Sequence, residues 1–469
     1  MIPERLLLAL QPVLDVVQPL ADRFAAADRR LYLVGGVVRD LLIGRDLADR
    51  DIDLTTDARP DQIKELLTGR VDALWTQGER FGTIGAKVAG ADGTEWTVEI
   101  TTHRADVYLP ESRKPEVRFS DQIEADLSRR DFTVNAMALE LPELALIDPY
   151  DGAADLAARR LRTPLEPQES FSDDPLRMLR AARFLAGYRL VPSDELVRAV
   201  AEMGDRLEIV SAERVRDELD KLMVVEDPSD GLWFLVETGL ADEFLPELLQ
   251  MRLEQDPIHH HKDVLAHTIA VVANTSPDRL TRLAALFHDI GKPKTRSFGP
   301  NGVMFHHHEV VGARMTKDRM TALRYPKEEV EIVTRLVRLH LRFHGYGTGT
   351  GWTDAAVRRF VRDADDQLDR LIELTRCDCT TRNKRKADML ARRMDDLVER
   401  IAALEVEEHV KSLRPDLDGR QVMDHLGLEP GREVGQALNM LLELRLDEGP
   451  LGEEEAFRRL DAWWAERSG

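Results

Sequence analysis

The chain has 469 residues, and its 65 Lys and Arg against 86 Asp and Glu give a formal charge of −21. With 43% hydrophobic residues it can build packed cores, which excludes a disordered tail, and its length suggests roughly two to four domains. Two cysteines cannot form a disulfide framework, and no apolar run reaches the ~20 residues that span a bilayer. We therefore exclude secreted and membrane classes and expect a cytoplasmic protein.

The N-terminal part of the chain reads as a mixed α/β domain. Apolar residues in 1–30 recur near helical spacing, although Pro12 and Pro19 weaken the prediction of a helix there. Strand-like runs then alternate with helical ones. We expect strands at 31–34, 51–55, 83–88 and 96–101, and helices at 37–43 and 60–67. This part ends near the turn-like segment 148–152, and from about residue 155 onward helical patterns predict an all-α remainder, with a loop at 345–351.

Two glycines and two aspartates form the first candidate site. Gly35 and Gly36 lie between an expected strand and an expected helix, where glycine lets the backbone approach a phosphate and the helix N-terminus offers N–H donors. On the next expected strand, alternation puts Asp51 and Asp53 on one face and Ile52 on the other. Paired carboxylates beside a phosphate cradle suit Mg²⁺ carrying a triphosphate. Taken singly, the glycines are more often a tight turn and the aspartates a solvated strand.

A later carboxylate leaves two alternatives open. Glu99, on the expected strand 96–101, is either a third carboxylate near the metals or an exposed strand residue.

Further motifs follow in order along the chain. They are Arg129-Arg130-Asp131-Phe132-Thr133-Val134-Asn135, Asp174-Pro175-Leu176-Arg177 with Arg180, and Ser211-x-Glu213-Arg214. Together with the glycine pair, Arg39 and the aspartate pair, they resemble the family of class II tRNA nucleotidyltransferases and bacterial poly(A) polymerases. The similarity covers residues 31 to about 225 and implies a polymerase-β-like head followed by helical domains.

The resemblance also implies the roles of individual residues. Asp51 and Asp53 would be catalytic and would hold two Mg²⁺, which activate the RNA 3′-hydroxyl and neutralise charge on the α-phosphate and the departing pyrophosphate. The implied nucleotide-binding residues are Gly35, Gly36, Arg39, Arg129, Arg130, Asp131, Asn135, Asp174, Arg177 and Arg180. Among these, Arg129, Arg130 and Asp131 are expected at the start of a helix, in contact with phosphate and ribose. Without the motif, the two arginines would read as a solvated pair.

Asp174 and Arg177 are expected to choose the base. Three positions apart, they share one face of a helix, and in the family this pair acts as the template. The Asp accepts from the amino group of cytosine or adenine and the Arg donates to a ring acceptor, so CTP and ATP fit while UTP and GTP do not. Standing alone, the pair would read as an ordinary surface ion pair.

One segment distinguishes CCA addition to tRNA from poly(A) addition. Poly(A) polymerases of this family carry a Gly-Arg-Arg-Phe-Arg-like stretch soon after the aspartates, and residues 81–88 contain no such arginine pair. The resemblance therefore favours CCA addition to tRNA from CTP and ATP. Poly(A) polymerase activity, and a non-catalytic RNA-binding head joined to a phosphohydrolase, remain as alternatives. The sequence does not distinguish full CCA addition from A addition, and it leaves the oligomeric state open.

A histidine-rich stretch carries the second candidate site. The His288-Asp289 doublet in an apolar helix is costly to bury unless it is ligated or paired. With His267 and Asp378 it resembles the ligand set of the HD metal-dependent phosphohydrolase superfamily, over about 258–385. The resemblance adds His308 and His340 as ligands of a second metal, and such a set suits Mn, Ni or Mg. Whether this domain hydrolyses a substrate stays open. Solvated turns are expected for His259, His260, His306, His307 and His344.

The expected fold class is α+β, in four parts. They are a polymerase-β-like head (1–150), a helical neck and body for nucleotide selection and RNA binding (151–255), an HD domain (256–385) and a helical tail (386–469). The expected phosphate-binding surface for tRNA consists of the basic stretch 376–393 and of a cluster beside the nucleotide site, namely Arg159, Arg160, Arg162, Arg180 and Arg183. For any single residue, a solvated helix face is an equally good interpretation.

Overall fold

The computed structural model describes the chain except for residues 1–3, 46, 48–50, 91–92, 105–106, 110–111, 117, 254–262, 300–301, 347–351, 380–383, 409–413 and 469. The chain divides into two compact units, Met1–Pro246 and Glu247–Gly469, which are treated separately below. A strand-rich head followed by helical parts confirms the predicted α+β class. Within the described ranges, no helix is both long and apolar enough to cross a membrane. The four-part division and the predicted loop at 345–351, most of which lies outside the described residues, stay predictions.

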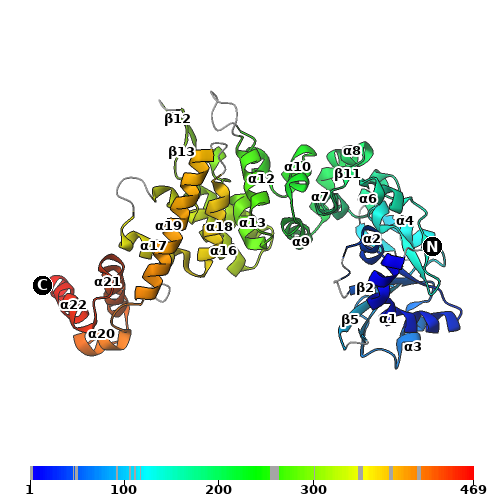
Figure 1. The fold of residues 1–469 in the computed structure, drawn as a ribbon, viewed down its shortest axis with the longest axis horizontal. Helices are drawn as coiled ribbons and strands as arrows, with labels where there is room; N and C mark the ends of the chain where they lie inside the picture. Colours follow the sequence, from blue (N-terminus) through cyan, green and yellow to red (C-terminus); the bar gives the residue numbers. More distant parts are fainter. Residues whose placement is uncertain are drawn as a thin grey trace. The chain divides into compact units, whose positions relative to one another are not determined.

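A seven-stranded sheet forms the centre of the first unit (Figure 1). Its strand order is β3-β4-β5-β2-β1-β8-β9, in which β2 runs parallel to β5 and antiparallel to β1. The strands are β1 Leu31–Val34, β2 Asp51–Thr56, β3 Ala73–Trp75, β4 Thr83–Ala89, β5 Glu95–Thr102, β8 Ala138–Leu141 and β9 Ala145–Ile147. A separate ribbon pairs β6 Val107–Leu109 with β7 Ser112–Glu116. The four predicted strands are confirmed to within one residue at each end.

Short helices connect the strands of the head. They are α2 Gly36–Ile43, α3 Pro60–Leu67, α4 Ile123–Ser128 and α5 Gly152–Ala157, with 3-10 turns at Glu79–Phe81 and Thr133–Asn135. The first helix, α1 Glu4–Ala26, continues through both Pro12 and Pro19 and packs against α2, α3 and β1. Its buried face includes Val13, Val17 and Phe24. Burial of this face outweighs the helix-breaking cost of the prolines, which is about 3 kcal/mol each.

A helical neck completes the first unit. Its helices are α6 Pro167–Asp173, α7 Leu176–Tyr188, α8 Asp194–Met203, α9 Ala212–Met223 and α10 Ser229–Glu237. Helix α7 is central, because it contacts α6, α9 and α10 and buries most of its length. A short parallel pair, β10 Arg160–Leu161 and β11 Val191–Pro192, joins the chain before α6 to the chain after α7. It departs from the all-α prediction for this part, because two residues are too few to show a strand pattern.

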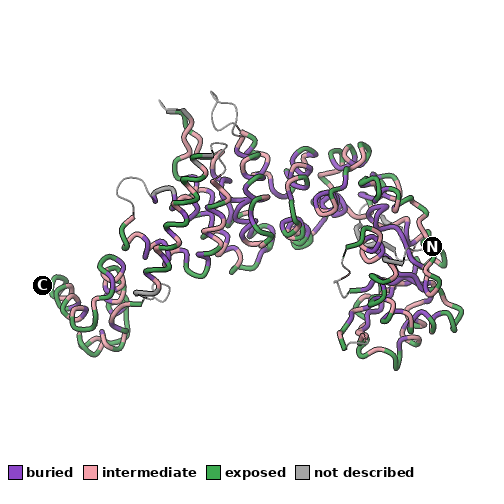
Figure 2. The backbone as a smooth tube through the Cα atoms, in the orientation of Figure 1, coloured by how far each residue is buried: buried purple, intermediate pink, exposed green. Residues whose placement is uncertain are grey.

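The second unit, in its described residues, has all its strands in one hairpin, and its other elements are helical. It comprises α11 Pro246–Gln250, α12 Val264–Asn274, α13 Arg279–Phe287, α14 Lys292–Thr295, α15 His308–Ala322, α16 Lys327–Leu339, α17 Asp354–Ala364, α18 Leu368–Asp378, α19 Lys384–Glu408, α20 Gly419–Leu426, α21 Arg432–Glu448 and α22 Glu453–Ser468. Buried residues line α12, α13, α16 and α18, which pack together (Figure 2). The hairpin of β12 Arg296–Gly299 and β13 Gly302–Phe305 shows that the all-α prediction was wrong here, because neither segment alternates polar and apolar residues.

Candidate functional site

Two carboxylates project from one face of β2. Ile52, between Asp51 and Asp53, is buried, as the alternation predicted. The parallel pairing of β2 with β5 sets Asp53 directly opposite Glu99, whose backbone position is exposed. Desolvation raises the pKa of Asp53, and the charge of Asp51 adds to this rise while Arg130 opposes it. Desolvation, followed by the charges of Asp53 and Asp51, also raises the pKa of Glu99. Carboxylates that raise one another's pKa favour a cation beside them, and a divalent cation would suit this position.

Glycine is required at the end of β1. Gly35 has φ of 76°, a conformation that other residues rarely adopt. A Cβ atom there would lie 3.3 Å from Oδ2 of Asp53 and 3.5 Å from Nη1 of Arg130. At Gly36, a Cβ atom would lie 3.3 Å from Nη2 of Arg39. The glycine pair therefore leaves room for the carboxylate and guanidinium groups to converge on the start of α2.

An open pocket of about 200 Å³ lies beside Asp53. It is lined by Val34, Asp53, Leu54, Thr101, Arg104, Arg129 and Arg130. Its polar wall therefore combines a carboxylate with three arginines, which suits a phosphate group that carries a metal. No role was predicted for Arg104 from the sequence, although this residue, two positions after the end of β5, belongs to a stretch that is similar to the family.

The placement of Arg129, Arg130 and Asp131 at the start of a helix was wrong. Helix α4 ends at Ser128, and these three residues follow it. The chain then extends at Phe132, which is completely buried, before the 3-10 turn begins at Thr133. Anchoring of this aromatic ring in an extended backbone prevents a new helix from starting at Arg129. Arg129 and Arg130 nevertheless line the pocket, as their predicted phosphate contact requires.

The other predicted nucleotide-binding residues form a buried network next to the pocket. Arg39 donates from Nη1 to Asn135 Oδ1 at 2.7 Å, and its guanidinium stacks on Tyr188, 4.1 Å from the ring centre. Asn135 donates to Asp131 Oδ1 at 2.9 Å. Asp131 Oδ2 accepts from Nε of Arg180 at 2.8 Å. Burial opposes ionisation of Asp131, but Arg180 outweighs it and holds the pKa well below its usual range. These residues support the pocket and connect it to α7.

Asp174 and Arg177 do not share a helix, which corrects the prediction. Asp174 lies in an extended conformation at the end of α6, and α7 begins at Leu176, because the residue before Pro175 is disfavoured in the helical region. Oδ1 of Asp174 accepts from the backbone N–H of Leu176 at 3.2 Å, and Oδ2 accepts from Arg214 at 2.9 Å. The pair is therefore fixed by other partners and makes no i,i+3 ion pair.

Arg177 points toward the head. Its Nη1 donates to the Ser170 hydroxyl at 2.8 Å, and its Nη2 donates to the backbone carbonyl of Arg129. The side chain is buried, with 8% of the residue exposed. Arg177 thus links α7 to the segment that lines the phosphate pocket.

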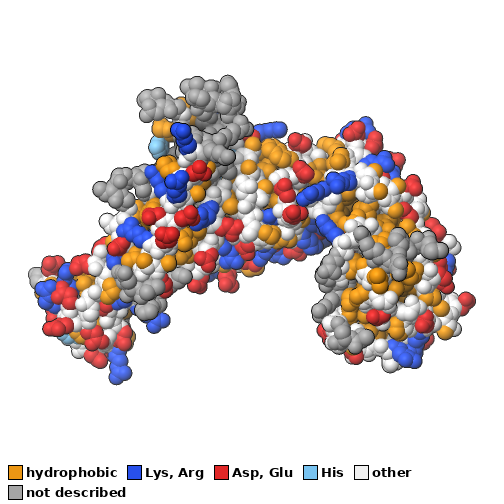
Figure 3. All heavy atoms as spheres, in the orientation of Figure 1, with side chains coloured by type: hydrophobic (Ala, Val, Ile, Leu, Met, Phe, Trp, Pro, Cys, Tyr) orange, Lys and Arg blue, Asp and Glu red, His pale blue; other side chains and the backbone are white. Residues whose placement is uncertain are grey.

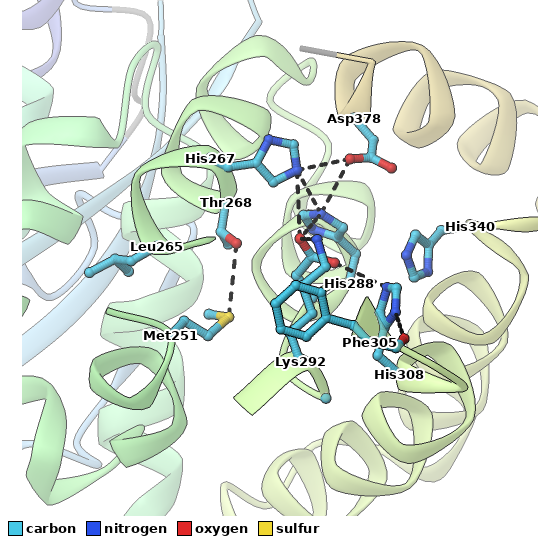
Figure 4. Close-up of polar contacts among 12 residues, drawn as sticks. Met251, Leu265, His267, Thr268, His288, Lys292, Phe305, His308, His340 and Asp378 are labelled. Atoms are coloured by element: carbon cyan, nitrogen blue, oxygen red, sulfur yellow. Dashed lines mark hydrogen bonds and ion pairs between the residues drawn. The ribbon is translucent and has the colours of Figure 1, made fainter. Parts of the chain in front are cut away.

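The six predicted HD ligands come together in the second unit (Figure 4). His267 lies on α12, His288 and Asp289 follow the end of α13, and Asp378 ends α18. His308 begins α15, and His340 follows α16. Two groups have ligand atoms within 4.8 Å of one another: His267, His288 and Asp378, and Asp289, His308 and His340.

Asp289, a member of the second group, also contacts His288 of the first group. Its Oδ2 is 3.2 Å from Nε2 of His288, and its Oδ1 is 3.3 Å from Nε2 of His308. On the other side, Nε2 of His267 is 2.9 Å from Oδ1 of Asp378 and 3.3 Å from Nε2 of His288. Oδ2 of Asp289 also forms an ion pair with Nζ of Lys292, at 2.6 Å. One carboxylate facing ligands on both sides is suited to bridge two cations.

The outer ring nitrogens of three histidines are held by the backbone. Nδ1 of His288, His308 and His340 lies 2.6–2.8 Å from the carbonyl three residues earlier in each case. This contact directs each Nε2 inward as a lone-pair donor. The Nε2 atoms of His308 and His340 are buried and have no hydrogen-bond partner among the described residues. A metal ion would satisfy both, so the residues fit the predicted group.

Charges in the cluster also favour a cation. Burial alone would lower the pKa of His288, but Asp289 and Asp378 outweigh it and raise the pKa to about 10. Burial, followed by the charge on His288, lowers the pKa of His340 to about 3. The negative charges of Asp289 and Asp378 therefore hold a proton on His288, and the same charges would attract a metal cation. Among the remaining histidines, His306 and His307 are exposed, as predicted, whereas His259, His260 and the side chain of His344 lie outside the described residues.

Comparison with known protein families gives three matches along the chain. Residues 31–162 match the poly A polymerase head domain. Residues 192–251 match a probable RNA- and SrmB-binding site of polymerase A, and residues 263–404 match the HD domain.

Relatives cover nearly the whole chain. The A-adding tRNA nucleotidyltransferase of Deinococcus radiodurans is 33% identical over 449 residues, which is 93% of this chain and 96% of the relative. The CC-adding tRNA nucleotidyltransferase of Thermus thermophilus is 32% identical and covers 92% and 93%. Among solved structures, the Bacillus stearothermophilus CCA-adding enzyme in complex with CTP matches with a TM-score of 0.66 at 21% identity, over 100% of this chain and 99% of that one. This last likeness shows the shared fold.

Proposed function

The chain belongs to the class II tRNA nucleotidyltransferase family, with an HD domain, and from that premise we propose that it builds or repairs the CCA end of tRNA from CTP and ATP. The observation that carries the proposal is the pocket that Asp53, Arg129 and Arg130 line together, with Asp53 and Arg130 both next to the Gly35 turn. Such a site can bind the triphosphate and the reacting hydroxyl together. Its partners are tRNA and nucleoside triphosphates, and its metal is a divalent cation, for which Mg²⁺ is the proposed identity.

The residues in and next to the pocket have different proposed roles in nucleotidyl transfer. Asp51 and Asp53 would hold two Mg²⁺, which, when bound, activate the RNA 3′-hydroxyl and neutralise charge on the α-phosphate and on the pyrophosphate that leaves. Arg129 and Arg130 bind the phosphates from the opposite wall through charge-assisted hydrogen bonds. The glycine turn admits the phosphates close to the start of α2. The 3′-oxygen then forms a bond to the α-phosphorus as the bond to the β-phosphate breaks.

Nucleotide choice is proposed to lie with Asp174 and Arg177. The carboxylate of Asp174 keeps 26% of its side chain exposed, so it retains accepting capacity for the amino group of cytosine or adenine. We expect Asp174→Asn, whose amide adds a donor, to raise UTP and GTP incorporation relative to CTP and ATP. Competition assays with all four nucleotides measure this ratio, and an unchanged ratio would contradict the proposed role. Asp217→Asn, which changes an exposed carboxylate on α9, is the control.

The surface that binds tRNA phosphates is proposed to be a limited basic region of this acidic chain. On the face drawn in Figure 3, basic side chains gather over the neck helices and stand among acidic ones elsewhere. Of the predicted cluster, Arg162, Arg180 and Arg183 pair with Asp155, Asp131 and Glu218. Arg160 also contacts Asp155, at 3.4 Å, but it is exposed, as is Arg159, so these two residues are better placed for phosphate contact. In the stretch 376–393, Arg376 pairs with Asp395, Arg385 and Arg392 are exposed, and Arg382 lies outside the described residues.

Substitution of the two aspartates tests the proposed activity. On a tRNA transcript that ends before CCA, the wild type should add two cytidines from CTP alone and complete the end when ATP is present. Asp51→Ala and Asp53→Ala should each abolish incorporation while the circular dichroism spectrum is unchanged. Asp61→Ala removes an exposed carboxylate of the same unit and should leave the rate unaltered. Full activity in both aspartate variants would refute the proposal.

The poly(A) alternative is not favoured, because the relatives that match nearly the whole chain are named tRNA nucleotidyltransferases. Long tails made from ATP alone would favour it. Transcripts that end before CCA, before CA and before A distinguish addition of all three nucleotides from addition of adenosine only. The non-catalytic head is likewise disfavoured by the two carboxylates on one face of β2, of which Asp53 lines the pocket.

A second activity is proposed for the HD cluster. His267, His288, Asp378, Asp289, His308 and His340 would hold one or two divalent ions (Mn, Ni or Mg), which, when bound, supply a hydroxide and polarise a phosphate ester. The buried Nε2 atoms of His308 and His340, which make no hydrogen bond within the described part of the chain, favour this proposal. His288→Ala should lose metal and any phosphate release, whereas Asp51→Ala should retain both. Phosphate release that is unaffected by His288→Ala would contradict it.

A further inference from the structure

A carboxylate with no solvent exposure lies directly behind the arginines of the nucleotide pocket. Asp126 is on α4, three and four positions before Arg129 and Arg130, so all three side chains are on one side of the chain. Neither the motifs nor the proposed chemistry gives Asp126 a role. Its position nevertheless sets the orientation of two pocket residues.

The two oxygens of Asp126 hold different arginines. Oδ1 accepts from Nη2 of Arg129 at 2.8 Å and from its Nε at 3.2 Å, a two-pronged contact. Oδ2 accepts from Nη2 of Arg130 at 3.2 Å. Oδ1 also accepts from the backbone N–H of Arg104, the third basic residue of the pocket, at 3.4 Å. A single carboxylate therefore anchors all three arginine-bearing segments of the pocket wall.

The buried charge of Asp126 is compensated by the two arginines that it contacts. An isolated buried carboxylate is costly, and Asp126 is tolerated because two guanidinium groups compensate it. Burial would raise the pKa of Asp126, but Arg129 and Arg130 outweigh it and lower the pKa to about 2, so the group is ionised at neutral pH. One negative charge against two positive charges leaves a net positive charge for the pocket.

The Nη1 end of the Arg130 guanidinium lies at the glycine turn. This atom would lie 3.5 Å from a Cβ atom at Gly35. Asp126 thus occupies one end of the Arg130 guanidinium while the other end stays at the glycine turn, where the triphosphate is proposed to bind.

We propose that Asp126 is a positioning residue that holds Arg129 and Arg130 in the orientation that binds the triphosphate, and thereby sets the affinity for CTP and ATP alike. The inference rests on the proposed nucleotidyl transfer and deepens it. Because the triphosphate is common to both nucleotides, Asp126 acts on nucleotide affinity and not on base choice, which distinguishes it from Asp174.

The variant Asp126→Asn tests this role, because the amide keeps the shape and removes the charge. We expect the KM for CTP and for ATP to rise at least tenfold, by the same factor within threefold. The ratio of CTP to UTP incorporation and the KM for tRNA should stay within twofold of the wild type. A merely structural role would reduce the amount of active enzyme and leave each KM unchanged. Asp416→Asn breaks a comparably buried carboxylate–arginine pair, with Arg445, and should leave the nucleotide KM unaltered.

A double-mutant cycle provides the second measurement. If Asp126 acts through the arginines, Asp126→Asn should raise the KM less than threefold further in an Arg129→Gln, Arg130→Gln background. This background also removes the buried charge imbalance, so the triple variant should fold even if Asp126→Asn alone does not. A wild-type KM in Asp126→Asn, or a full tenfold effect in the Gln background, would overturn the proposal.

Calorimetric CTP binding separates this inference from the proposed function. A wild type that binds CTP but transfers no nucleotide to tRNA would refute the proposed activity. Loss of CTP affinity in Asp126→Asn would still support the positioning role in such a case, and unchanged CTP affinity would refute it.

Discussion

Gly35 meets two requirements, one of backbone conformation and one of space. Left-handed backbone costs a residue with a Cβ atom about 1–2 kcal/mol, and here the added atom would also crowd Asp53 and Arg130. We expect Gly35→Ala to lower the rate of CMP incorporation on the order of 100-fold, because a displacement of about 1 Å of a catalytic group has that effect. Initial rates at saturating CTP measure it.

Gly69 provides the matched control for this prediction. It has φ of 73°, yet a Cβ atom there would meet no atom within 4 Å. Gly69→Ala should therefore lose a similar amount of thermal stability and keep its activity. Equal activities in the two variants would show that crowding at Gly35 does not matter.

Protonation of His288 should compete with metal binding. Asp289 and Asp378 raise the pKa of His288 to about 10, so the histidine carries a proton at neutral pH in the metal-free protein. Raising the pH toward this pKa removes the proton, and apparent metal affinity should rise by up to about tenfold per pH unit. Titrations with Mn²⁺ at several pH values between 6.5 and 8.5 measure the slope. An affinity that does not depend on pH would contradict the prediction.

At the scale of elements, Gly291 sets how closely α14 approaches α15. A Cβ atom there would lie 2.3 Å from the carbonyl oxygen of His308 and 2.7 Å from the N–H of Gly312. Gly291→Ala should therefore displace the start of α15, and with it His308, and weaken metal binding roughly 10- to 100-fold. Metal content after dialysis measures the loss. Gly435→Ala, in α21, meets no atom within 4 Å and should retain the metal.

The sequence predicted elements well where one residue pattern dominated. Strands β1, β2, β4 and β5 were predicted because they are rich in apolar, aromatic and β-branched residues, and the Asp51–Ile52–Asp53 alternation placed both carboxylates correctly. The sequence-based prediction of elements was wrong where tertiary contacts or a proline determine where a helix begins or ends. Burial of the face that includes Val17 keeps α1 helical through its prolines, and Pro175 separates Asp174 from the helix of Arg177. Similarly, buried Phe132 keeps Arg129 off a helix start.

Site residues were predictable to the extent that a motif names them. The six HD ligands lie on or next to five separate helices, and no local pattern shows that Asp289 would face His308 as well as His288. Arg104 and Asp126 were missed as members of the pocket, because their roles depend on contacts between segments that are distant in sequence or on burial behind the pocket wall.

At the scale of the whole molecule, the two candidate sites lie in separate compact units. Asp51 and Asp53 belong to residues 1–246, and the HD cluster belongs to residues 247–469. Substitutions that share no partners usually act additively, so we expect His288→Ala to leave CMP incorporation within about twofold of the wild type. Conversely, Asp51→Ala should retain the metal of the HD cluster. Parallel measurement of incorporation and metal content in both variants and in the double variant checks this, and a large effect of His288→Ala on incorporation would contradict it.

The pleat of β2 has a consequence for how this protein can change over evolutionary time. Because consecutive side chains point to opposite faces, gaining or losing one residue inside 51–56 would exchange the faces, turning Ile52 outward and burying both acids. A slip of this kind would preserve the strand while eliminating catalysis. Descendant genes should therefore vary in length in the connections on either side of this strand and keep the six positions of the strand in constant number.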